Sequence, residues 1–170
     1  MILRQTTIND VPTLRHWDKQ AHVIAATGGG DWEWERELAQ GTPGIENFIA
    51  EINGRPLGFI QICDAVNEQS HYWESYLQLN PEPHVNAVDI WIGDEKDFRK
   101  GYGAAMMQLA HDRCFSDGEC SAILLDPLET NHRAHKFYES LGYQFIQHHT
   151  FDDDYCRVYR LDRKQWQNAN

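Results

Sequence analysis

The sequence predicts a single domain of the α/β (α+β) class that spans residues 1–170, and three observations predict it. Of the 170 residues, 41% are hydrophobic and 12% aromatic, which is enough for one packed core. Residues 88–107 have the pattern of a buried strand, a polar loop and a glycine-spaced turn that leads into a helix. A strand at 122–125 and a helix at 131–143 then follow in the same order.

The chain opens with a short strand and a helical region. Residues 2–4 form the expected strand. Thr7 supplies helix-capping chemistry, Pro12 suits a first helical turn, and Val11 begins an apolar helix face. We expect the helical region to continue through residues 22–26.

Three consecutive glycines at 28–30 interrupt this region. Asp31 then stands where it can cap a second helix. Trp32 and Trp34 lie beside the break, and two roles are open for them: anchors in the core, or an aromatic wall of a substrate cleft.

A β-hairpin is expected next. Residues 48–52 and 57–63 have the composition of strands and flank Asn53-Gly54, a dipeptide that strongly favours a hairpin turn. Because Pro56 has no backbone N–H to donate, we expect the second strand to begin after it.

Residues 64–87 lose this periodicity and predict a long connection before the central strand. Loops of such length are usually functional or disordered. Trp73 and Glu74, together with Tyr72 and Tyr76, place aromatic faces beside a carboxylate. We interpret this segment as part of the site that binds the acceptor.

The C-terminal half continues the alternation of helices and strands. Apolar spacing predicts a core helix over 103–115, and Gly142 is placed to cap the helix that begins at residue 131. The remaining expected elements are a strand that ends at residue 146, a turn at 152–154, a strand at 155–161 and a tail from residue 162 that is a short helix or disordered.

The glycine-spaced turn has the chemistry of an anion site. Gly101 and Gly103 remove two Cβ atoms, so that successive backbone N–H groups can point at one place. The helix that follows adds its unpaired N–H groups and the positive end of its dipole. Arg99 and Lys100 add positive charge, and the whole suits a pyrophosphate. The alternative is a glycine-relaxed loop before an ordinary core helix.

Two other glycine-rich phosphate loops do not fit this turn. A Walker-type loop requires Lys and Ser or Thr where Ala104 and Ala105 stand, and the dinucleotide fingerprint requires a third glycine where Met106 stands. The preceding strand would place the rest of a phosphorylated cofactor along its edge. The candidate cofactor-binding residues of these segments are Ile90, Trp91, Ile92, Arg99, Lys100, Gly101, Tyr102, Gly103 and Ala104.

The segment Arg-Lys-Gly-Tyr-Gly-Ala at 99–104 resembles the acyl-CoA pyrophosphate loop of the GCN5-related N-acetyltransferase (GNAT) superfamily. A second signature of that family is similar position for position, in the expected order, to Asn131, Ala134, Tyr138, Glu139, Gly142 and Tyr143. The resemblance implies acetyl-CoA as cofactor. It also implies a central mixed, mostly antiparallel sheet, splayed between strands 4 and 5, with helices on both faces.

The same resemblance assigns cofactor roles to two residues and exposes one departure. It implies that Asn131 hydrogen-bonds the pantetheine arm and that Tyr138 lies near the CoA sulfur. The family often has Gln or Arg at the head of the first loop, where this chain has Phe98. One phosphate contact is thereby weakened, while the backbone cradle is left intact.

Acetyl transfer from a thioester to an amine requires a base for the amine and an acid for the departing thiolate. Tyr138 is a candidate acid because its phenol can donate to sulfur, although its spacing also fits a core tyrosine. Asp89, on the central strand opposite Val88 and Ile90, and Asp126, at the end of the next strand, are candidate bases. Asp126 could instead be a turn residue. In a further alternative, no dedicated base exists and several carboxylates orient the amine.

Beyond the CoA signatures, the chain is similar to the aminoglycoside 6′-N-acetyltransferases of this superfamily. The similar features are Trp17, His22-Val23, the Asn-Gly hairpin, Trp73-Glu74, Asp89 and Asp126-Pro127. The resemblance implies that acidic residues bind a polycationic acceptor, so the candidate substrate-binding residues are Trp73, Glu74, Asp89 and Asp126. Related chains act on siderophore precursors, polyamines or protein N-termini. A CoA-binding module without turnover is the alternative from another class.

The composition limits the partners. A formal net charge of −11 argues against nucleic acid and permits a cationic small molecule, although acidity also serves solubility alone. No apolar run approaches membrane-spanning length and the start does not read as a signal peptide, so no membrane is expected.

Four cysteines without CxxC spacing predict reduced thiols in a cytoplasmic protein. The nine histidines form no closed ligand set, so no metal is expected. The oligomeric state is left open.

Overall fold

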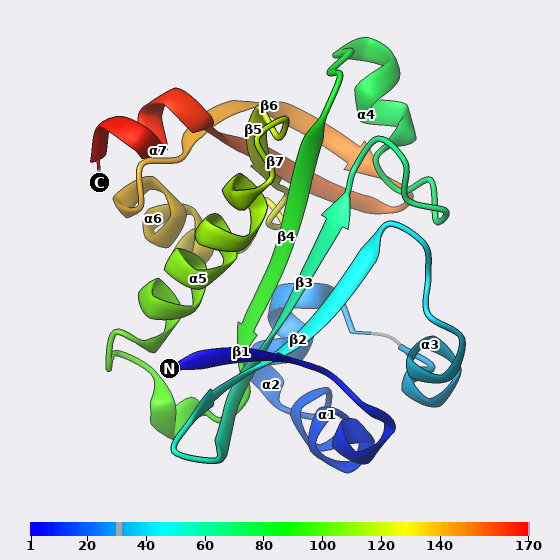
Figure 1. The fold of residues 1–170 in the computed structure, drawn as a ribbon, viewed down its shortest axis with the longest axis vertical. Coiled ribbons are helices and arrows are strands. Elements are labelled where there is room, and N and C mark those ends of the chain that lie inside the picture. The colour runs from blue at the N-terminus through cyan, green and yellow to red at the C-terminus, as the bar shows by residue number, and fades with distance from the viewer. Residues whose placement is uncertain (30–31, 170) are drawn as a thin grey trace.

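The computed structural model describes residues 1–29 and 32–169, and within them a mixed sheet of seven strands runs through the molecule (Figure 1). The spatial order is β1-β2-β3-β4-β5-β7-β6. All neighbouring pairs are antiparallel except β4 and β5, which are parallel. The strands are β1 (Ile2–Gln5), β2 (Ile45–Ile52), β3 (Arg55–Asp64), β4 (Val85–Ile92), β5 (Ala122–Leu125), β6 (Gln144–Phe151) and β7 (Asp154–Asp162).

Helices cover both faces of this sheet. On one face lie α5 (Tyr102–Ser116), α6 (His132–Ser140) and α7 (Arg163–Ala169). The other face carries α1 (Val11–Trp17), α2 (Ala21–Thr27), α3 (Trp34–Gln40) and α4 (Glu74–Leu79). Two short 3₁₀ turns, η1 (Ile8–Asp10) and η2 (Glu95–Asp97), complete the described elements.

The alternation of side chains along β4 decides which layer each residue meets. Val88 packs in one core cluster with Met106 and Met107 of α5, while Trp91 packs on the opposite face with Trp34 of α3. Because side chains alternate with a period of two, Asp89 shares the face of Trp91. This is the placement opposite Val88 that the sequence predicts.

The sheet opens between its two parallel strands. Backbone pairing between β4 and β5 covers Val85 with Ala122 through Ala87 with Leu124 and then stops, although β4 continues to Ile92. The predicted mixed sheet, splayed between strands 4 and 5 and covered on both faces, is therefore confirmed. The space that opens beyond Ala87 is where the candidate site lies.

The hairpin differs from the expectation at its second strand. β3 begins at Arg55 and includes Pro56, whereas the sequence predicted a start after the proline. The register shifts between Ala50 and Glu51, so Pro56 pairs at a bulge. A bulge tolerates a residue without an N–H, because regular ladder bonding is already interrupted there.

The other differences concern helices. The connection over 64–87 was predicted to be a loop, but it contains α4, whose Tyr76 is buried together with Trp73 against β4 and β7. Tertiary burial stabilises this helix, since six residues form a weak helix alone. The first helical region is divided into α1 and α2 by Gln20, which is extended. Glu33 is the N-cap residue of α3, and the predicted cap Asp31 lies outside the described residues.

Gly93, directly after β4, is the point where Trp17 comes closest to the sheet. A Cβ at Gly93 would lie 2.0 Å from Trp17 Cε2, and Trp17 is itself buried. We expect Gly93→Ala to lower the free energy of unfolding by about 1–3 kcal/mol through overpacking. Urea denaturation measures this change.

Gly118→Ala is the matched control, because a Cβ there meets no atom within 4 Å and the backbone is not left-handed. Its stability should change by less than about 1 kcal/mol. Equal unfolding midpoints for the two variants would contradict the packing of Trp17 on Gly93.

Candidate active site

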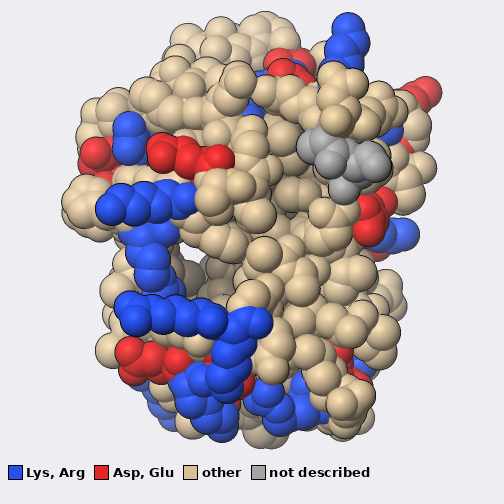
Figure 2. All heavy atoms as spheres, turned by 90° about the vertical axis from the view of Figure 1, so that its left-hand side faces the viewer, with Lys and Arg blue, Asp and Glu red and all other residues tan. Residues whose placement is uncertain are grey.

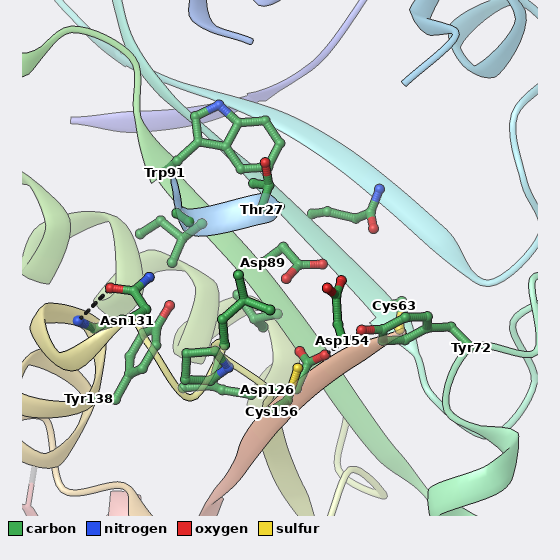
Figure 3. Close-up of a pocket in the computed structure, with 18 of the residues that line it drawn as sticks. Thr27, Cys63, Tyr72, Asp89, Trp91, Asp126, Asn131, Tyr138, Asp154 and Cys156 are labelled. Atoms are coloured by element: carbon green, nitrogen blue, oxygen red, sulfur yellow. Dashed lines mark hydrogen bonds between the residues drawn. The ribbon is translucent and has the colours of Figure 1, made fainter. Parts of the chain in front are cut away.

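A cavity of about 1530 Å³ occupies the opening between β4 and β5. One end is formed by the turn before α5 and by the first turns of α6, and the other by acidic and aromatic side chains. Figure 3 shows Asn131 and Tyr138 on the α6 side, while Asp89 of β4, Asp126 just after β5 and Asp154 of β7 converge. Apart from Lys100, the sequence-predicted cofactor and acceptor residues therefore meet in one space.

The turn before α5 has the geometry of an anion cradle. Gly101 adopts φ 78°, a left-handed conformation that favours glycine, and it is the N-cap of the fifteen-residue α5. As a glycine it has no side chain to cap the helix, and a Cβ there would meet no atom within 4 Å. Gly101, Tyr102, Gly103 and Ala104 all line the cavity. The open first-turn N–H groups fit a pyrophosphate.

The two basic residues before the turn behave differently. Arg99 lines the cavity, but Lys100 is absent from its lining and its ammonium lies 3.0 Å from Asp97 Oδ1. Asp97 is buried and also pairs with Arg55 at 2.7 Å, and these cations lower its pKa to about 2. The sequence had suggested that Lys100 presents its charge to the cavity. In the structure Lys100 braces the loop through Asp97.

Phe98, which stands where the family often has Gln or Arg, brings a second cation to the loop. The Arg133 guanidinium of α6 lies 4.2 Å above the Phe98 ring, and Arg133 lines the cavity. On the face that carries α5 and α6, Lys and Arg side chains surround a hollow in the surface (Figure 2). This rim is positive although the whole chain has a net charge of −11, so it can attract an anionic cofactor.

Asn131 caps α6 and also lines the cavity. Its side-chain Oδ1 accepts a hydrogen bond from the Ala134 N–H at 3.2 Å (Figure 3). The cap uses the oxygen and leaves the amide NH₂ to donate, as contact with the pantetheine arm requires. Along the facing strand, Ile90, Trp91 and Ile92 line the same space.

Tyr138 occupies both positions that the sequence left open. It belongs to the buried cluster beneath α5 and α6, and it also lines the cavity. Burial, followed by the charges of Asp89 and Asp126, raises the pKa of its phenol. The phenol therefore keeps its proton at neutral pH and can act as a donor.

Asp89 and Asp126 are brought together in the acidic half. The Asp89 side chain is open to the cavity, yet protein surrounds it, and this burial with the charge of Asp126 raises its pKa. Burial also raises the pKa of Asp126, against an opposing hydrogen bond from Tyr72. Carboxylates with raised pKa values in a cleft are suited to accepting protons near neutral pH.

The structure gives a specific contact to Tyr72, which the sequence placed only in the acceptor-binding segment, and it adds Asp154 to the site. The Tyr72 hydroxyl donates to Asp126 Oδ2 at 2.7 Å. Asp154, at the start of β7, lines the cavity and its charge contributes to the raised pKa of Asp126. The sequence treated Asp154 as part of a turn, and no local pattern indicates that β7 returns beside β5.

The predicted acceptor residues divide between wall and rim. Trp73 is buried and lines the cavity, whereas Glu74 lines it with a side chain 58% exposed that lies near His71. Trp34 is a core anchor, while Trp32 is partly buried beside it, and both border the cavity. The two roles proposed for this aromatic pair therefore coexist.

Covalent and metal chemistry find no support among the described residues. Cys63 and Cys156 line the cavity, but burial and nearby carboxylates raise both thiol pKa values, that of Cys156 to about 12. The thiols are therefore protonated and weakly nucleophilic. In the described ranges no three His, Cys, Asp or Glu side chains come together in a set that could hold a metal ion.

Residues 6–151 match the family model described as an acetyltransferase (GNAT) domain. The chain belongs to this family. It is 25% identical over 150 residues to the aminoglycoside N(6′)-acetyltransferase type 1 of Klebsiella pneumoniae, covering 84% of this chain and 73% of that protein. A protein of the same name from Serratia marcescens matches equally.

Solved structures match the fold over almost its full length. The structure of AAC(6′)-Ib in complex with ribostamycin and coenzyme A has a TM-score of 0.85 at 25% identity, covering 99% of this chain and 96% of that one. An aminoglycoside N(6′)-acetyltransferase from Legionella pneumophila has a TM-score of 0.76 at 18% identity, with 99% and 95% coverage.

The protein is thus an N-acetyltransferase of the GNAT family that uses acetyl-CoA. When bound, acetyl-CoA supplies the acetyl group as a thioester. The cradle at Gly101, the Asn131 amide and the Tyr138 phenol would hold its pyrophosphate, pantetheine and sulfur. No helix among the described residues has the length and apolar composition needed to cross a membrane.

The raised pKa of Asp89 makes stability depend on pH. Between the ordinary aspartate range and the raised value, the folded state binds a proton that the unfolded state has released, so the free energy of unfolding falls as pH rises. We expect Asp89→Asn to weaken this fall in urea titrations at acid and neutral pH. Its kcat/KM should drop about 10²–10⁴-fold through loss of a base.

Asp112→Asn, which removes an exposed carboxylate on α5 outside the cavity lining, is the control and should keep the wild-type pH dependence. A wild-type kcat/KM in Asp89→Asn would exclude a role of Asp89 as the base.

Tyr138→Phe tests the acid role. The variant keeps the ring in the core and loses only the phenol proton, so we expect kcat to fall about 10²-fold while CoA affinity is nearly unchanged. Calorimetry with CoA measures the affinity, and thiol release measures kcat. Tyr155→Phe, at an exposed position of β7, should change neither. An unchanged kcat in Tyr138→Phe would exclude the phenol as the acid.

Proposed function

We propose that this N-acetyltransferase acts on the 6′-amine of aminoglycosides, by direct transfer in a ternary complex. The observation that carries the proposal is the joining of the CoA cradle to an acidic acceptor chamber in one cavity. Acidic side chains of the lining outnumber the basic ones, Arg36, Arg99 and Arg133. The acidic ones are Glu37, Glu68, Glu74, Asp89, Glu95, Asp97, Asp126, Asp152 and Asp154.

Such a chamber suits a ligand with several ammonium groups. Low dielectric walls strengthen attraction between carboxylates and cations compared with water. Trp32, Trp73 and Tyr72 add flat apolar surfaces beside the carboxylates, which suit the faces of sugar rings. The matched relatives are named aminoglycoside N(6′)-acetyltransferases, and one structural neighbour is a complex with coenzyme A and kanamycin. Both names support an aminoglycoside acceptor.

The side chains can carry the protons of the reaction. Asp89 takes one proton from the arriving ammonium group, which leaves a neutral amine. As the amine nitrogen bonds to the acetyl carbon and the carbon–sulfur bond breaks with its electron pair on sulfur, Tyr138 protonates the sulfur. The second proton lost by nitrogen restores the Tyr138 phenol through solvent. Asp126 and Asp154 hold the other ammonium groups in place.

We also infer that the protein is cytoplasmic. Its four cysteines are free and buried, which agrees with a reducing compartment.

Thiol release in the presence of different amines tests the proposed function. Kanamycin and ribostamycin should support turnover, and mass spectrometry should find one added acetyl group at the 6′-amine. An aminoglycoside with a hydroxyl in place of that amine should not be N-acetylated there. Turnover with polyamines or peptides alone would show that the acceptor belongs to one of those classes and is not an aminoglycoside. Absence of turnover with every amine, while CoA binds, would identify a non-catalytic module.

A further inference from the structure

The two carboxylates in the acceptor chamber are held differently. Asp126 accepts a hydrogen bond from the Tyr72 hydroxyl at 2.7 Å. Asp89 accepts no hydrogen bond from any residue that the structure describes, and it is influenced by burial and by the charge of Asp126. The pair is therefore chemically unequal before any ligand arrives.

Ring packing fixes the position of the Tyr72 hydroxyl. The ring stacks on Phe151 with centroids 4.7 Å apart and planes 12° apart, and it meets the edge of Trp73 at 6.1 Å. The segment before it is tied by Glu68, which is 4% exposed and accepts from both the backbone N–H, at 2.6 Å, and the hydroxyl of Ser70. The hydroxyl is therefore held at Asp126 by contacts independent of the hydrogen bond itself.

This contact favours one ionisation state of the pair. A hydrogen bond donated to a carboxylate stabilises its charged form. Asp126 should therefore lose its proton first, and its charge then makes Asp89 hold its own proton more strongly. Such a pair releases its protons in two separate steps.

The other groups around the pair act in different ways. The negative charge of Asp154 on β7 opposes ionisation of Asp126, so the Tyr72 hydrogen bond must outweigh it. Tyr138 on α6 and the thiols of Cys63 and Cys156 stay protonated, because burial and the same carboxylates raise their pKa values. These three groups therefore do not compete with Asp89 for the proton.

We propose that Tyr72 is a positioning residue that gives the two carboxylates different roles. It keeps Asp126 as the fixed anion that holds an ammonium group of the acceptor, and so it leaves Asp89 as the group that receives the proton. The amine-binding part of this inference rests on the proposed function. The order of ionisation rests on the protein alone.

Tyr72→Phe is the decisive variant, because it keeps the ring that packs on Phe151 and removes only the hydroxyl. Tyr159→Phe is the matched control, since its hydroxyl also donates to a carboxylate, Glu139 at 3.0 Å, away from the cavity lining. Thermal melts should show both variants folded.

The first measurement is a carboxyl-carbon NMR titration of the ligand-free protein. In the wild type and in Tyr159→Phe, Asp126 should ionise at lower pH than Asp89. In Tyr72→Phe, the Asp126 titration should move to higher pH by about one unit, as expected for loss of a hydrogen bond to a charged group. An Asp89 that ionises first in the wild type, or an unmoved Asp126 titration in Tyr72→Phe, would overturn the proposal.

The second measurement is the pH profile of kcat/KM with kanamycin. At pH values below both ionisations, kcat/KM of Tyr72→Phe should fall about tenfold, because the form with both carboxylates charged becomes less populated, and it should recover at higher pH. A purely structural role would instead lower the rate equally at every pH, and this result would overturn the inference.

The two measurements separate this inference from the proposed function. If kanamycin is not acetylated but the ligand-free titrations shift, the aminoglycoside assignment is wrong and the role of Tyr72 is confirmed. If kanamycin is acetylated and the titrations do not shift, only the role of Tyr72 is wrong.

Discussion

The early end of pairing between β4 and β5 is the constraint on which the rest of the structure depends. Their three paired positions hold the two halves of the sheet together, and the strands separate beyond Ala87. A separated strand leaves one edge of its backbone without a sheet partner, and such groups require other partners. The ring nitrogen Nε2 of His22 lies 2.8 Å from the Ile92 carbonyl oxygen and meets one such need. The cofactor can occupy the rest of the opening.

The same opening brings two kinds of electrostatic surface into one cavity. A positive rim of loop and α6 side chains leads inward to the N-terminus of α5, whose dipole also favours an anion. Behind it, carboxylates from β4, the end of β5 and β7 form an acidic chamber. An anionic cofactor and a cationic amine are therefore attracted to opposite ends. In the proposed mechanism they meet between Tyr138 and Asp89, where the protons move.

Sequence reasoning succeeded where the chemistry is local. The hairpin at Asn53-Gly54, the fifteen-residue α5 and the Asn131 helix start follow from turn, cap and periodicity rules within a few residues. It failed where distant contacts decide. α4 is a helix because Tyr76 and the adjoining Trp73 are buried against strands far along the chain. The structure also pairs the Lys100 ammonium with Asp97, whose burial and second cation, Arg55, depend on the fold.

By itself, the sequence determined the anion cradle, the order of its two signatures and hence the family and cofactor, because a glycine turn and a helix N-terminus act through neighbouring backbone atoms. Only the tertiary structure decided the acceptor chamber. Asp89 lies on β4, Asp126 directly after β5 and Asp154 at the start of β7, and Tyr72 reaches Asp126 from a fourth segment. Their approach depends on strand order and on the opening of the sheet. The resulting mutual repulsion and shared burial, which set their proton affinities, exist only in the folded chain.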